Sequence, residues 1–129
     1  MLSFFVLINC LPHGTAIAQD ALSEWDRLTK ETVTLVNQGN LPLAEEKARE
    51  TLSFSERALP DPSLELATAH NNLGSILSFQ EKYAESEKHH RAALALRRQI
   101  LSADDPLITT SLENLADVFR RMAKYGDAV

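Results

Sequence analysis

The sequence repeats itself with a period of 42 residues, and this period limits the folds open to the chain. Apolar or small residues recur at equivalent positions when the chain is shifted by that length. The aligned sets are Leu35 with Leu77 and Phe119, Leu41 with Tyr83 and Tyr125, Ala44 with Ser86 and Ala128, and Leu28 with His70 and Leu112. A fixed period of this length is typical of a solenoid, in which each unit buries its apolar face against its neighbours.

Within each period the pattern is helical. After Gln19, glycine and proline occur singly, and apolar residues recur at spacings of three and four. Asp61-Pro62 and Asp105-Pro106 each combine an N-cap acceptor with a proline at the first helical position, so each predicts a helix start. A third start is expected after the turn residues Gln38-Gly39-Asn40.

These signals predict an all-α fold, a right-handed α-solenoid of antiparallel helix pairs. The expected helices cover about 21–37, 42–58, 62–79, 83–101 and 106–122, with a sixth beginning near Tyr125. The repeats cover about 24–60, 62–103 and 106–129, and the last is incomplete. Because solenoids normally end in a polar capping unit, we expect the chain to be a piece of a longer protein.

The first residues have the order of a signal peptide. An apolar run from Leu2 to Leu11 is followed by Pro12-His13-Gly14, which should break it, and by the small residues Ala16-Ile17-Ala18. We therefore expect a signal peptide at 1–18, cleavage after Ala18, a repeat domain at 19–129, and export to the periplasm or the extracellular space. No Lys or Arg precedes the run. The alternative is a lipid anchor on Cys10, the only cysteine.

The central part of the chain carries a family resemblance. Residues 67–74 (ATAHNNLG), 80–87 (QEKYAESE) and 91–94 (RAAL) resemble the 42-residue tetratricopeptide repeats of the kinesin light chain class. The third repeat matches well through Tyr125, and the first matches loosely. The resemblance implies a helical-pair solenoid that binds proteins or peptides.

Four positions depart from the pattern of that class. Ser86 stands where alanine is usual, and His90 where an aromatic residue is usual. Glu31 and Thr32 stand where the first repeat should have leucine and glycine. The first repeat is therefore expected to be a divergent end unit, an N-terminal cap.

The resemblance also implies a binding groove, because the first helices of such repeats line the inside of a curved array. The candidate groove residues are Thr68, Asn71, Asn72, Ser75, Phe79, Thr110, Glu113, Asn114, Asp117 and Arg121. Asn72 and Asn114 match the position where the family often places an asparagine that hydrogen-bonds a peptide backbone. The alternative is that they bond a neighbouring loop or face water. Arg121 either meets a partner carboxylate or is a solvated helix end.

Other chemistries find little support. The net charge of −5 is spread without a basic run, so no nucleic-acid partner is expected. His70, His89 and His90 suggest a metal, but adjacent helical positions diverge by about 100°, so we expect neither metal nor cofactor. The sequence has no phosphate-binding loop, nucleophile elbow or zinc-protease motif.

The leading hypothesis is thus a non-enzymatic interaction module that acts outside the cytoplasm. A second hypothesis is an accessory N-terminal repeat region of a larger exported enzyme or signalling protein. A third is self-association, in which the uncapped C-terminal end stacks on another copy.

Overall fold

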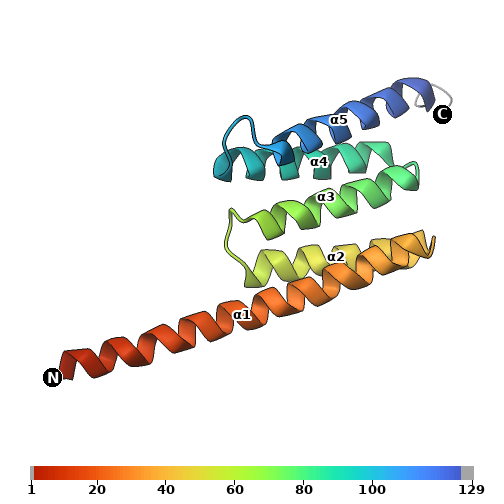
Figure 1. Ribbon diagram of the computed structural model, residues 1–129. Helices are drawn as coiled ribbons and strands as arrows, with labels where there is room; N and C mark the ends of the chain where they lie inside the picture. The colour runs from red at the N-terminus through yellow and green to blue at the C-terminus, as the bar shows by residue number, and fades with distance from the viewer. Residues whose placement is uncertain (1, 126–129) are drawn as a thin grey trace.

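The computed structural model describes residues 2–125, with side chains from residue 18 onward, and this part of the chain contains helices and no strand. The elements are α1 (Leu2–Asn37), α2 (Leu41–Ala58), α3 (Leu64–Phe79), α4 (Tyr83–Ile100) and α5 (Pro106–Tyr125). Successive helices run antiparallel and stack side by side, and α1, α3 and α5 are the first helices of the three repeats (Figure 1). The predicted all-α repeat architecture is confirmed.

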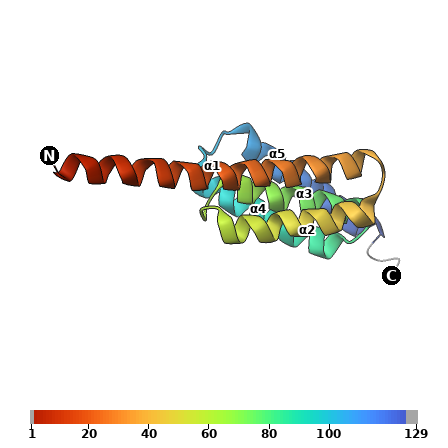
Figure 2. The same ribbon diagram turned by 90° about the horizontal axis from the view of Figure 1, so that it is seen from below.

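The predicted start of the first helix is wrong, because α1 begins at Leu2 and passes through Pro12 and Gly14 without a break. A proline removes one backbone donor, and the helix here continues on both sides of that loss. The N-terminal half of α1 extends beyond the other helices in both views (Figures 1 and 2). Among the described residues, no helix combines the length and apolarity needed to cross a membrane. The signal peptide remains a prediction.

Helix starts agree with the sequence in two cases of three. Asn40 caps α2, and its side-chain oxygen accepts from the Leu43 N–H at 3.3 Å. Asp105 accepts from the Leu107 N–H at 2.9 Å and so caps α5. For α3 the cap is Ser63 rather than Asp61, because the Ser63 hydroxyl accepts from the Leu66 N–H.

The turns between paired helices repeat as well. Gly39 and Glu81, 42 residues apart, both have positive φ, at 74° and 65°. The third equivalent, Ala123, lies inside α5, which ends at Tyr125. Tyr125 therefore does not begin a sixth helix, since alanine favours continued helix over a left-handed turn. The remainder of the predicted sixth helix falls on 126–129, outside the described residues.

The core is centred on α3. Leu73, Ile76 and Leu77 are at most 2% exposed and pack with residues of α2 and α4. Burial of several large aliphatic side chains in one cluster is the main source of stability for an array of this size.

Helices α3 and α4 approach closely at Gly74. A Cβ at this position would lie 2.9 Å from Nε2 of His90, which is almost fully buried. The Ser86 hydroxyl donates to the Gly74 carbonyl at 2.6 Å. In the first repeat the equivalents of Gly74 and His90 are Thr32 and Ala48, so the larger residue is on the opposite helix.

Polar contacts join neighbouring repeats. Buried Arg97 of α4 donates from Nη1 to the Ser111 hydroxyl at 2.7 Å and to the Leu107 carbonyl at 3.2 Å. On the outer surface, Arg49 of α2 pairs with Glu85 of α4 at 2.6 Å. Exposed pairs of this kind contribute at most about 1 kcal/mol each.

Gly74→Ala is expected to lower the free energy of unfolding by about 1–3 kcal/mol, because the new methyl group overlaps the buried His90 ring. The measurement is urea unfolding followed by circular dichroism. In a His90→Ala background, Gly74→Ala should lower the free energy of unfolding by a smaller amount, because the imidazole ring is absent. An equal cost in both backgrounds would contradict this account.

Candidate partner-binding groove

A cleft of about 130 Å³ lies between α1 and α3, the first helices of the first two repeats. Three of the predicted groove residues, Asn72, Ser75 and Phe79, line it from α3. The remaining lining residues are Thr32, Val33, Val36 and Ile76. The structure therefore brings part of the predicted stripe to a real depression in the surface.

The cleft is apolar with a polar edge. Val33 and Phe79 are 47% and 57% exposed, which is high for such side chains. Thr32 is buried, and its hydroxyl already donates to the Leu28 carbonyl at 2.9 Å. The amide of Asn72 has no hydrogen-bond partner within residues 18–125, so its donors and its acceptor remain available.

The equivalent asparagine in the third repeat behaves differently. Asn114 donates from Nδ2 to Oδ1 of Asn71 at 2.8 Å, which joins α5 to α3. Asn114 therefore bonds a neighbouring helix and not the loop that the alternative named, and Asn72 bonds no residue within 18–125. On the same helix Arg121 pairs with Asp117 at 2.7 Å. The third-repeat part of the groove is thus polar and internally paired.

The other predicted residues do not line the cleft. Thr68 is half-buried on α3, one helical turn before Asn72. Thr110 donates its hydroxyl to the Pro106 carbonyl at 3.0 Å. Glu113 is exposed on α5.

The contribution of α1 to the cleft was not among the predicted residues. Val33 and Val36 belong to the first repeat, whereas the predicted stripe covers the second and third repeats. Shifting Ser75 back by 42 residues gives Val33, so the period contained the signal for this residue. Ile76 was missed because its position in the repeat also belongs to the core.

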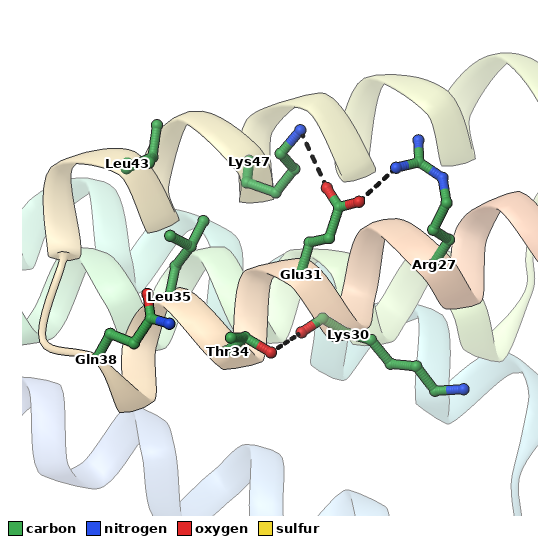
Figure 3. Close-up of a pocket in the computed structure, with 8 residues that line it drawn as sticks. All are labelled: Arg27, Lys30, Glu31, Thr34, Leu35, Gln38, Leu43 and Lys47. Atoms are coloured by element: carbon green, nitrogen blue, oxygen red, sulfur yellow. Dashed lines mark hydrogen bonds and ion pairs between the residues drawn. The ribbon is translucent and has the colours of Figure 1, made fainter.

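A wider cleft, of about 640 Å³, lies on the N-terminal face of the array, between α1 and α2. Figure 3 shows its charged residues around Glu31, which pairs with both Arg27 and Lys47. Lys30 pairs with Asp26 at 2.6 Å. The cations of this cleft are therefore neutralised by carboxylates of the same chain.

This face has the composition of a cap. Arg27, Glu31 and Thr34 are equivalent to Ala69, Leu73 and Ile76, which are almost fully buried in the second repeat. Polar residues at core positions allow a surface to face water, as terminal units of solenoids require. The interpretation of the first repeat as a divergent end unit stays a prediction, which this polar face favours.

Three histidines lie close together between α3 and α4. The Nδ1 atoms of His70 and His89 are 3.0 Å apart, so one ring donates and the other accepts. Burial lowers the pKa values of both. Within residues 18–125, no group of three or more potential ligand side chains is placed to hold a metal ion.

Antiparallel helix pairs related by a 42-residue period define the class of helical repeat proteins. Comparison with known families matches the tetratricopeptide repeat to residues 65–129. The chain belongs to the tetratricopeptide repeat family. No curated protein matches the chain.

Acidification is expected to destabilise the fold through His90. Burial lowers the pKa of His90 to about 4, an effect increased by His89 and Arg97 and opposed by Asp117. The folded pKa lies below the unfolded value of about 6.5, so stability is full above pH 6.5 and falls as pH drops towards 4. The total loss from this group is about 3 kcal/mol.

The measurement is the free energy of unfolding across that pH range for the wild type and for His90→Phe. The variant lacks the titrating group, so its curve should be flatter, with the remaining slope due to His70, His89 and the carboxyls of Glu24 and Glu45, whose pKa values are lowered by Arg27 and Lys82. Identical slopes would exclude His90 as the cause.

Proposed function

We propose that the chain is a protein–protein interaction module that holds an extended protein or peptide segment in the groove formed by α1, α3 and α5. Tetratricopeptide repeats commonly mediate protein–protein interactions. The single observation that carries the proposal is the cleft between α1 and α3. There the Asn72 amide, unbonded within residues 18–125, adjoins the exposed side chains of Val33 and Phe79.

The two halves of this site have separate roles in the proposed complex. The apolar lining accepts one aliphatic or aromatic side chain, since a volume of about 130 Å³ fits a single residue. The Asn72 amide donates to and accepts from the partner backbone, which fixes the direction of the bound segment. Burial of Phe79, now 57% exposed, supplies much of the binding energy.

Two finer assignments belong to the same proposal. The 42-residue spacing of Gly39 and Glu81 supports a repeat of the kinesin light chain type. The apolar run from Leu2 to Leu11, followed by Ala16-Ile17-Ala18, supports export.

Phe79→Ala and Asn72→Ala should each weaken binding about tenfold or more, because one removes apolar contact area and the other a backbone hydrogen bond. The probe is a peptide selected on the wild-type chain from a random displayed library, and binding is followed by fluorescence anisotropy. Leu43→Ala, an equally apolar change on the N-terminal face, is the control and should bind normally. Failure to enrich any peptide, or equal binding by Phe79→Ala, would reject the groove.

Export is expected to shorten the chain to a product that begins at Gln19. The measurement is the intact mass of the protein recovered from the periplasm or medium of an expressing bacterium. Ala18→Asp should block cleavage, whereas Cys10→Ser should leave it unchanged. Recovery of only full-length chain in the cytoplasm would contradict export.

A further inference from the structure

Two histidines on facing helices share a hydrogen bond between like atoms. His70 lies on α3 and His89 on α4, and their Nδ1 atoms are 3.0 Å apart. The ring centroids are 5.3 Å apart, which leaves about one ring radius beyond each nitrogen. The two Nδ1 atoms therefore lie almost on the line between the rings. Such a bond needs one protonated and one unprotonated Nδ1, so it depends on the proton content of the pair.

The pair takes up protons in two steps that differ in their effect on the bond. When His70 is the donor, a first added proton enters at its Nε2, and the resulting imidazolium still donates to neutral His89. The only site left for a second proton is Nδ1 of His89. Burial lowers the pKa of His89, and a charge on His70 lowers it further. After the second step two N–H groups and two positive charges face each other, so the bond is lost.

Charged groups surround the pair from α2, from α4 and from the loop between α2 and α3. Burial is the largest cause acting on both rings, and it lowers their pKa values. The carboxylates oppose this effect, and the cations add to it. The groups are Arg49, Glu56, Asp61, Glu85 and Lys88. The adjacent His90 stays neutral above its own pKa of about 4 and adds no charge at higher pH.

A cavity beside His70 offers its ring a second position. The cavity has a volume of about 570 Å³, and His70 borders it together with Glu56 and Asp61. The rest of its lining is Leu66, Ala92, Ala95, Leu96 and Gln99. Neither carboxylate has an ion-pair partner within residues 18–125. A charged imidazole that turns into this cavity meets opposite charge, whereas a neutral one keeps its better partner in His89.

We propose that His70 is a pH-operated switch between two partners. It bonds His89 while the pair holds at most one added proton, and it turns to the carboxylates of Glu56 and Asp61 once the pair holds two. The first state joins α3 to α4. The second state joins α3 to the last turn of α2 and the loop that follows it.

The chemistry of these groups limits the pH range of the switch. An ordinary imidazole titrates near pH 6.5, and burial moves both rings of this pair below that value. Side-chain carboxylates in general keep their charge down to about pH 4. The switch therefore operates between about pH 4 and pH 6.5, where a doubly charged histidine pair and charged carboxylates coexist.

The first test is a pH titration of the histidine rings in the full chain by ¹H–¹⁵N NMR. At neutral pH one ring of the pair should carry its proton on Nδ1. On acidification the His70 ring should lose its nuclear Overhauser contacts with His89 and gain contacts with the side chain of Glu56. Circular dichroism at each pH verifies that the chain is helical. Rings that stay together throughout, or a chain that unfolds before His70 moves, would overturn the proposal.

The second test removes the charges of the acid-state partners. Glu56→Gln combined with Asp61→Asn should move the midpoint of the second titration step down by about one pH unit, because the charged His70 ring loses both carboxylates. Glu46→Gln removes an exposed carboxylate of the same helix, ten residues before Glu56, and should leave the midpoint unchanged. Equal midpoints in the two variants would exclude the switch. Neither test involves a bound peptide, so the result is independent of the groove.

Discussion

The contact between α3 and α4 at Gly74 is the constraint on which the rest of the array depends. Two backbones approach closely there, the Ser86 hydroxyl bonds the Gly74 carbonyl at 2.6 Å, and a buried imidazole fills the space beside it. The imidazole fits in its neutral form, since burial disfavours a charge. Every other helix packs on this hairpin, directly or through one neighbour, so its geometry sets the spacing of the whole structure.

The groove depends on this hairpin indirectly. Asn72, Ser75 and Phe79 lie on α3, while Val33 and Val36 lie on α1. These two helices contact each other less than each contacts α2. The width of the cleft is therefore decided by how α2 packs against both helices, and not by the residues that line it.

The sequence predicted what periodicity and turn chemistry control, namely the helices, their order and two of three helix starts. The start of α1 was predicted too late, because Pro12 and Gly14 suggest a break. The helix tolerates both residues, since the residues on either side of them are helical. The prediction also treated Asn72 and Asn114 alike. Asn114 reaches Asn71 on the adjacent helix, whereas the residue equivalent to Asn71 on α1 is Thr29, whose buried hydroxyl has no partner among the described residues. Asn114 and Asn72 differ because Asn71 is long enough to meet its partner across the helix interface, whereas the shorter Thr29 is not. A single sequence does not show which side chains meet across an interface.

The buried Arg97 makes the two boundaries of the array unequal in the burial of their polar contacts. Its guanidinium ties α4 to the start of α5 through a carbonyl and a hydroxyl, and such directional bonds weaken steeply when groups move apart. At the equivalent position of the preceding boundary, Ser55 bonds only within its own helix, to the Thr51 carbonyl. The first and second units are also joined by polar contacts, from Gln80 to the Leu41 carbonyl, Lys82 to Glu45 and Arg49 to Glu85, but these lie at partly or fully exposed positions. Water therefore competes for the polar contacts at the boundary where the cleft lies, and is kept from the Arg97 contacts at the other.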